Sequence, residues 1–185
     1  MQSYKSALIA PILIALASAG DTKCRALVLS GGGSKGAWEA GVIWGLTHYG
    51  EPSDYYWDVH TGISAGSINT LGQVGFLPSE TVEASEYISN VAAHLNNDMI
   101  YQPWVGHGAT GIVRGCVTRI SCMNSDPMLH YLNDTLSDFT QVKRRFTIGA
   151  GDVNTGEYVK FTQDDVTFEE LPMVGMSSSS IPSIF

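Results

Sequence analysis

Basic residues are scarce in this sequence. It contains 10 Lys and Arg against 18 Asp and Glu, which gives a formal net charge of −8 at pH 7. Such a chain has no general attraction to nucleic acid or to anionic membrane surfaces, so a nucleic-acid partner is not expected. The sequence also lacks a cluster of His, Cys, Asp and Glu at metal-ligand spacing. We therefore expect no metal site, and no organic cofactor is implied.

Long apolar runs are absent apart from the N-terminus. Residues 7–16 form an apolar stretch after Lys5, and Ala17-Ser18-Ala19 fits the small-residue pattern of a cleavage site. The stretch is shorter than the about 20 residues that a comfortable membrane span needs. The pattern predicts a signal peptide over residues 1–19 and a secreted or luminal protein. An uncleaved anchor is the alternative.

Histidine is missing after His130. A triad of the α/β-hydrolase type follows the order Ser, then Asp or Glu, then His, so this absence argues against that class. No spacing singles out a catalytic histidine. We interpret all five histidines as surface or core residues: His48, His60, His94, His107 and His130.

A serine motif is present instead. Residues 62–66 read G-x-S-x-G, follow an apolar run at 56–60 and precede a helix-compatible stretch at 65–75. This order predicts a strand, a tight strained turn with Ser64 at its apex, and a helix. Side chains at Gly62 and Gly66 would collide with the neighbouring strand and helix. Ser64 is the candidate nucleophile, which needs a base for its proton and donors for the oxyanion.

A glycine cluster lies upstream of the serine motif. An apolar run at residues 26–29 predicts a buried parallel strand. Gly31, Gly32, Gly33 and Gly36 then lead into a helix predicted from about residue 37 to 49. Consecutive glycines expose backbone N–H groups, and the start of a helix adds partial positive charge. The cluster therefore predicts a cradle for negative charge.

This cradle has three interpretations: an oxyanion hole for Ser64, a dinucleotide-binding loop, or a structural turn. Gly31, Gly33 and Gly36 fit G-x-G-x-x-G, but that fingerprint alone is weak. Lys35 has the wrong neighbours for a P-loop. The joint occurrence with the serine motif favours the oxyanion hole, because either motif alone is common enough to arise by chance.

Together the two motifs resemble those of the patatin-like phospholipases. In that family Ser-Gly-Gly-Gly-Ser-Lys-Gly, here residues 30–36, follows a first strand, and Gly-Ile-Ser-Ala-Gly comes downstream. Further segments at residues 41–46, 151–157 and 177–185 are also similar, so the resemblance spans residues 25–185. It implies an α/β fold, a three-layer sandwich with a mainly parallel central sheet. Alternating strands and helices agree with a parallel sheet covered on both faces.

The resemblance also implies a function. Patatin-like enzymes hydrolyse lipid esters with a Ser–Asp dyad and a glycine-rich oxyanion loop. Carried over, Ser64 is the nucleophile, and the backbone around Gly31, Gly32 and Gly33 supplies the oxyanion donors. Lys35 either lies near a lipid phosphate or is a solvated cation beside the loop. The implied substrate is a glycerolipid or phospholipid, with transient contact with a membrane or lipid surface.

The family's catalytic aspartate has no match here. It lies in an Asp-Gly-Gly or Asp-Gly-Ala motif after a serine-rich segment with an Ile-Pro pair, which residues 177–185 resemble, whereas this sequence contains no Asp-Gly pair. The domain at residues 25–185 is interpreted as incomplete at its C-terminus, with a natural short form that lacks its base as the alternative. In the second case the chain is a non-catalytic lipid-binding or interaction module. Asp152 is interpreted as a turn-forming residue.

The remaining segments give coarser predictions. Helices are expected from about residue 78 to 95 and from 126 to 136, and strands at 145–150 and 158–161. Residues 96–125 read as a long irregular loop or cap. Within it, Trp104, Ile112 and Val113 are candidates for either lipid docking or the core. A sheet that lacks an element would also expose apolar surface and a bare edge.

The three cysteines leave the disulfide pattern open. In an oxidising compartment, Cys116 and Cys122 either close a small loop or remain free. Cys24 is then expected to be unpaired in this chain.

Overall fold

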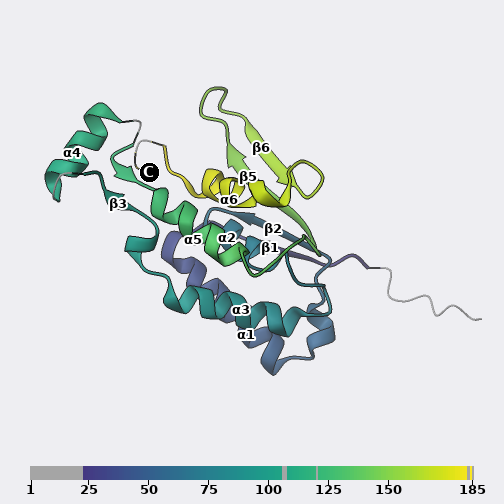
Figure 1. Cartoon of the computed structure of the whole chain (residues 1–185). Helices are drawn as coiled ribbons and strands as arrows, with labels where there is room; N and C mark the ends of the chain where they lie inside the picture. The colour runs from purple at the N-terminus through teal and green to yellow at the C-terminus, as the bar shows by residue number, and fades with distance from the viewer. Residues whose placement is uncertain (1–22, 106–107, 120, 183, 185) are drawn as a thin grey trace, which may run out of the picture.

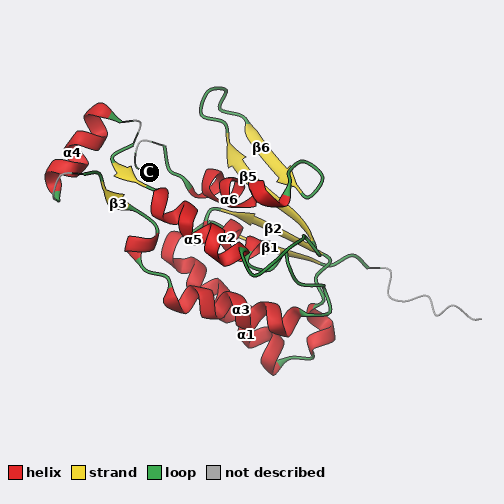
Figure 2. Cartoon of the chain, viewed as in Figure 1, coloured by secondary structure: helices red, strands yellow, loops and turns green. Residues whose placement is uncertain are grey.

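The structure is a computed structural model that describes residues 23–105, 108–119, 121–182 and 184. The predicted signal peptide and His107 lie outside the described residues. A four-stranded sheet forms the centre of the described part, and helices pack beside it (Figures 1 and 2). This arrangement confirms the predicted α/β class.

The central sheet is mainly parallel, as predicted. Its order is β1-β2-β5-β6; the first three strands run parallel and β6 pairs antiparallel with β5. A separate two-stranded sheet pairs β3 with β4. The bounds are β1 Ala26–Leu29, β2 Val59–Ile63, β3 Gln102–Pro103, β4 Met123–Asn124, β5 Arg145–Gly151 and β6 Tyr158–Thr162.

The described helices agree with most of the sequence pattern. Helix α2 ends at Leu71, earlier than predicted, and α6, whose first turn contains Pro172, was not predicted. The α-helices are α1 Gly36–Tyr49, α2 Ala65–Leu71, α3 Thr81–His94, α4 Ala109–Thr118, α5 Asp126–Leu136 and α6 Leu171–Ser179. The 3-10 turns are η1 Gly33–Lys35, η2 Pro52–Tyr55, η3 Asn97–Met99 and η4 Phe168–Glu170.

One face of the sheet builds the core. Alternate residues of a strand share a face, so Leu29, His60, Phe146 and Ile148 point to the same side. Helices α2 and α6 pack on this face, and α5 packs on α6. The core cluster comprises Leu71, Val74, Met128, Leu132, Leu136, Phe146, Ile148, Leu171 and Val174. Removal of this apolar surface from water is the main term that stabilises the fold.

A second cluster holds α1 against α3 at the β1 edge. Leu29 and Trp57 contribute from the sheet side, Ala40 and Ile43 from α1, and Ile88 from α3. This packing fixes the start of α1, and with it the glycine cluster, beside the sheet.

The opposite face of the sheet carries exposed apolar side chains. Val28, Ile63 and Tyr158 are 72%, 45% and 64% exposed. In the described part of the chain, the helices that pack on the strands, α2 and α6, lie against the other face. Helices were expected on both faces of the sheet. In the described part of the chain they cover one face.

Residues 96–125 are more regular than predicted. They contain η3, β3, α4 and β4, and a disulfide joins Cys116 of α4 to Cys122. Of the two alternatives for these cysteines, the bonded one is correct, and Cys24 is free and exposed. Ile112 and Val113 are exposed, so the core alternative is wrong for them. Sequence patterns missed α4 because glycine lowers helix propensity.

Within the described ranges, no helix combines the length and apolar composition that crossing a membrane requires.

Candidate active site

Ser64 occupies a sharp turn between β2 and α2. Its backbone has φ 53° and ψ −122°. In the described part of the chain it is the one non-glycine residue with positive φ. A Cβ is disfavoured in this region, so the turn stores strain on the order of 1–3 kcal/mol. A strand, a strained serine and a helix in this order form a nucleophile elbow.

The glycines on both sides of Ser64 are required by close backbone packing. A Cβ built on Gly62 would lie 2.5 Å from the carbonyl carbon of Gly66 and from Thr70 Oγ1. One built on Gly66 would lie 2.6 Å from the carbonyl carbon of Leu29 and 2.8 Å from the carbonyl oxygen of Ser30. Glycine at these positions therefore lets α2 approach both its own strand and β1.

The glycine cluster lies directly against the serine turn. A Cβ built on Gly31 would lie 3.2 Å from Ser64 Cβ and 3.9 Å from Ser64 Oγ. One built on Gly36 would lie 2.9 Å from Ala65 Cβ. The parallel pairing of β1 with β2 explains this proximity, because the carboxyl ends of parallel strands open on the same edge of a sheet. Two motifs that are distant in the sequence are thus neighbours in the fold.

Backbone donors are available beside Ser64. Within the described part of the chain, the amide N–H groups of Gly31, Gly32 and Gly33 donate no hydrogen bond. Gly33 has a φ of 57°, a conformation that glycine adopts without steric cost. The start of α1 follows at once and adds partial positive charge. Lys35 is exposed, lies against Gly32, and is not among the cavity-lining residues described below.

A serine side chain from α6 holds the backbone amide of Ser64. The Ser64 N–H donates to Ser178 Oγ at 2.9 Å, and Ser178 Oγ donates to the Gly149 carbonyl at 2.6 Å. The Ser64 amide is thus occupied, which leaves the glycine cluster as the source of free donors on this side. Ser178 lies in the segment 177–185 that resembles the family, but no local sequence pattern predicted this role for it.

Two further serines bind the carbonyl of Ser64. Ser67 Oγ donates to the Ser64 carbonyl oxygen at 2.6 Å, and Ser179 Oγ donates to the same oxygen at 3.2 Å. Both polar ends of the strained residue are therefore held by side chains. Such over-determination is what allows a strained conformation to persist.

Glu39 fixes the entry of the glycine cluster. Its Oε1 accepts the Ser30 amide at 3.0 Å and the Ser30 hydroxyl at 3.2 Å. Asn69 of α2 donates to the Gly36 carbonyl at 2.9 Å. These contacts join the start of the cluster to α1 and its end to α2, so the loop is held at both sides.

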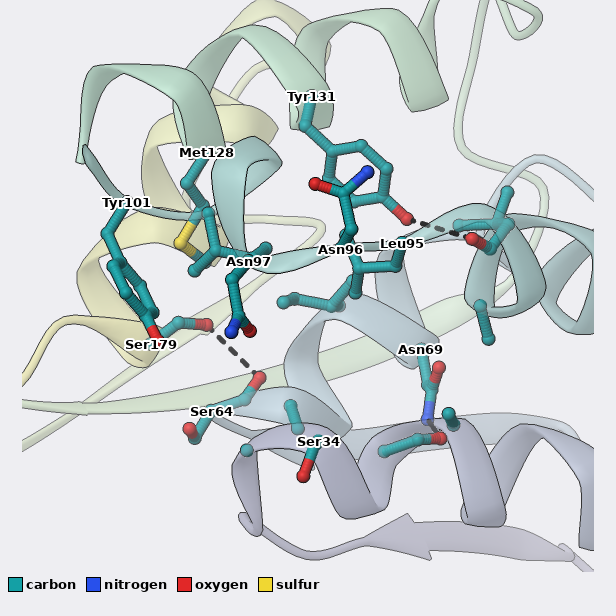
Figure 3. A pocket seen from close by; sticks show the side chains of 18 of the residues that line it. Ser34, Ser64, Asn69, Leu95, Asn96, Asn97, Tyr101, Met128, Tyr131 and Ser179 are labelled. Carbon is teal, nitrogen blue, oxygen red and sulfur yellow. Dashed lines mark hydrogen bonds between the residues drawn. The ribbon is translucent and has the colours of Figure 1, made fainter.

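Ser64 opens on a cavity of about 500 Å³, a size typical of small-molecule sites. Figure 3 shows Ser64 and Ser34 on one side and Tyr101, Met128 and Tyr131 on the other. Apolar lining residues are Ile68, Val91, Leu95, Ile100, Met128 and Ile181. Asn69, Asn96, Asn97 and Tyr101 supply the polar part of the wall. Burial raises the pKa of Tyr131 to about 12, so this phenol is neutral.

No carboxylate, imidazole, lysine or arginine is among the described residues that line this cavity. Asp152 remains a turn residue, as predicted: the Asn154 amide donates to its Oδ1 at 2.8 Å, and this bond lowers the pKa of the Asp152 carboxyl. Of the described histidines, His48 bonds Glu86 and His94 bonds the Asn90 carbonyl.

His60 is a core residue of β2. It is fully buried, and its Nε2 accepts a hydrogen bond from Arg144 Nη1 at 2.6 Å. Burial, and then the positive charge of Arg144, lower the pKa of His60 well below its ordinary 6.5. This neutral imidazole serves packing, in agreement with its interpretation as a structural residue.

Three solved structures resemble this chain at low identity. VipD from Legionella pneumophila is 16% identical over 88% of this chain and 43% of that chain, with a TM-score of 0.46. The heterodimeric ExoU–SpcU complex of the type III secretion system of Pseudomonas aeruginosa is 18% identical over 88% of this chain and 37% of that chain, with a TM-score of 0.43. A second structure of the ExoU–SpcU complex from that organism is 18% identical over 86% of this chain and 39% of that chain, with a TM-score of 0.42.

This chain spans less than half the length of the solved structures that it matches. No curated protein is significantly similar to it in sequence. A family model described as patatin-like phospholipase matches residues 27–185, which include both glycine motifs and Ser64. The chain belongs to the patatin-like phospholipase family.

Proposed function

We propose that this chain is a lipid acyl hydrolase domain that cleaves carboxylic ester bonds of glycerolipids or phospholipids. The observation that carries the proposal is the contact of Gly31 with Ser64, at the edge of a largely apolar cavity. A nucleophile, backbone donors and an apolar binding surface are the three parts that acyl transfer from a lipid requires.

The reaction proceeds through an acyl-enzyme. Ser64 Oγ bonds to the ester carbonyl carbon, and the alcohol part of the lipid leaves with the proton that Ser64 gives up. Water then attacks the acyl-serine, releases the fatty acid and restores the hydroxyl. In both steps the carbonyl oxygen becomes negative, and the amides of Gly31, Gly32 and Gly33 are the proposed donors to it. Each such donor lowers the free energy of the transition state by about 3 kcal/mol.

The proton acceptor for Ser64 separates this proposal from a second one. The hydrolase requires an aspartate that reaches Ser64, as in the family's Ser–Asp dyad. A chain without it is a non-catalytic lipid-binding or interaction module. The observation that favours this reading is that none of the described residues lining the cavity carries a carboxylate. Sequencing the 3′ end of the transcript decides between the two. A downstream Asp-Gly-Gly or Asp-Gly-Ala supports the hydrolase, and a stop codon directly after Phe185 supports the module.

We further propose that the protein is secreted or luminal. The predicted signal peptide motivates this, and the Cys116–Cys122 disulfide is a bond that persists in oxidising compartments. N-terminal sequencing of the mature protein is expected to start at Gly20. An N-terminus at Met1 in cytosolic protein would contradict this proposal.

The activity is tested on full-length protein with vesicles that carry a fluorogenic phospholipid ester. Ser64→Ala is expected to reduce hydrolysis to background and to abolish covalent labelling by a fluorophosphonate. Ser177→Ala serves as the control, because this serine is exposed and bonds only the Met173 carbonyl of its own helix. Wild-type turnover in Ser64→Ala would show that the assignment is wrong.

A further inference from the structure

Helix α4 exposes its large apolar side chains and buries its smallest residues. Gly111 and Gly115 are its buried positions, whereas Ile112, Val113 and Val117 are 38%, 62% and 76% exposed. A helix on the surface of a soluble domain normally shows the opposite arrangement, with large apolar residues toward the protein. The outward face of α4 is therefore unexplained by packing within the described chain.

The orientation of α4 is fixed by its contacts. A Cβ built on Gly115 would lie 2.6 Å from the Cys122 carbonyl oxygen and 2.8 Å from Trp104 Nε1, so only glycine fits there. The Cys116–Cys122 disulfide ties the helix to the segment before β4. Trp104 Nε1 also donates to the Ser121 carbonyl at 3.0 Å. Because of these contacts, α4 cannot rotate to bury its valines.

The charge around α4 differs from that of the whole chain. Residues 99–125 contain no Asp or Glu, although the chain has 18 of them, and they include Arg114 and Arg119. Arg119 lies over the Trp104 ring at 5.0 Å, and Arg114 is exposed on α4. The exposed apolar face is thus part of a segment with a local positive charge, in a protein that is otherwise acidic.

The same segment is continuous with the wall of the cavity. Ile100 and Tyr101 line the cavity and lead directly into β3. On the other side, Ile181 lines the cavity, and the Ile184 carbonyl accepts the amide of Met123 in β4 at 2.8 Å. The hairpin that carries α4 is therefore joined to the cavity through both strands; Figure 1 shows α4 projecting from the sheet and its helices.

We infer that the outward face of α4, formed by Ile112, Val113 and Val117 together with Val105, docks on an anionic lipid surface. Val105 is 86% exposed and precedes the helix. An amphipathic helix of this kind binds at the boundary of headgroups and acyl chains, through buried apolar area and attraction of its cations to anionic lipids. The inference rests on the proposed function, since docking there brings the cavity of Ser64 to its substrate. A second copy of the chain is the alternative occupant, and it is an outcome of the test.

The test measures sedimentation of the full chain with phosphatidylcholine vesicles, with and without phosphatidylglycerol. A Ser64→Ala background prevents hydrolysis from altering the vesicles. Val113→Asp combined with Val117→Asp is expected to weaken binding by about tenfold or more for each valine. Arg114→Glu is expected to weaken binding to anionic vesicles only, and to reduce its salt dependence. The matched control is Val153→Asp, at a position that is 73% exposed in the β5–β6 turn, and it is expected to bind as the parent.

Three results would overturn the inference. The first is a double valine variant that binds vesicles as tightly as the parent. The second is an equal loss in Val153→Asp, which would reveal a non-specific charge effect. The third is that the parent chain sediments as a dimer in sedimentation velocity, whereas the double valine variant sediments as a monomer. In a chain with Ser64 intact, hydrolysis of a soluble short-chain ester should be unchanged by the valine substitutions. If the parent chain does not hydrolyse this ester, the proposed hydrolase function is wrong. The vesicle-binding measurements still test the docking inference separately.

Discussion

The hydroxyl of Ser178 bridges the amide of Ser64 and the carbonyl of Gly149. It accepts from the first at 2.9 Å and donates to the second at 2.6 Å. Through this hydroxyl, α6 ties the turn after β2 to the neighbouring strand β5. The strained serine is thus held from the core side, while its own hydroxyl forms no hydrogen bond within the described residues.

Removal of this bridge should reduce turnover more than binding. We expect Ser178→Ala to lower kcat about tenfold with little change in KM, because the turn relaxes and the nucleophile loses its alignment. The free energy of unfolding should fall by about 1 kcal/mol, the typical worth of a hydrogen bond. Steady-state kinetics and urea denaturation check both values. Ser177→Ala, one position away and exposed, should leave both unchanged; equal effects in the two variants would contradict the bridge.

The strain at Ser64 predicts a stabilising substitution. Ser64→Gly should be inactive but more stable than Ser64→Ala by about 1 kcal/mol, because glycine adopts positive φ without a Cβ penalty. Chemical denaturation of the two variants measures the difference. Equal stabilities would show that the turn is unstrained.

Gly66 should tolerate no side chain. Gly66→Ala places a Cβ 2.6 Å from the carbonyl carbon of Leu29, and both sides of this contact are backbone. We expect a loss of about 3 kcal/mol in the free energy of unfolding. Gly41→Ala is the control, since nothing lies within 4 Å of its added Cβ in α1. That variant should gain roughly 0.5–1 kcal/mol. A mild effect at Gly66 would mean that α2 is free to move away from β1.

The cavity should set acyl-chain preference. Leu95 lines it, so Leu95→Trp should shorten the space available to a fatty acyl chain. We expect the ratio of kcat/KM for long-chain to short-chain esters to fall about tenfold, the scale of steric discrimination in apolar pockets. His94→Trp, at the adjacent exposed position outside the cavity, should leave the ratio unchanged. An unchanged ratio in Leu95→Trp would place the acyl chain elsewhere.

Stability should fall in mild acid because of His60. Burial and the charge of Arg144 hold the folded pKa of His60 below 6.5, so the unfolded chain binds the proton more readily. The contribution of neutral His60 to the free energy of unfolding is therefore fully present above pH 6.5. It is lost as the pH falls toward the pKa of His60 in the folded state. The expected slope is up to about 1.4 kcal/mol per pH unit. Urea titrations between pH 7 and 5 measure it. His60→Gln should remove this slope, whereas His130→Gln, at an exposed position, should keep it.

Much of the candidate site could be predicted from the chemistry of neighbouring residues in the sequence. The apolar runs before Gly31 and Gly62 predicted β1 and β2, and the glycines predicted turns that only residues without a Cβ can make. The parallel pairing of the two strands followed from their alternation with helices. The proximity of Gly31 to Ser64 is a consequence of that pairing, so the sequence alone predicts both parts of the site.

The sequence by itself determined the strand–turn–helix around Ser64 and the glycine cluster, because these depend on steric limits within a few neighbouring residues. Only the tertiary structure decided that Ser178 binds the Ser64 amide, that α4 turns its valines outward, and that Val28 and Ile63 lie on an exposed sheet face. Those features depend on which faces of distant elements meet. Such choices sum many weak contacts across the fold, and no local propensity or period contains them.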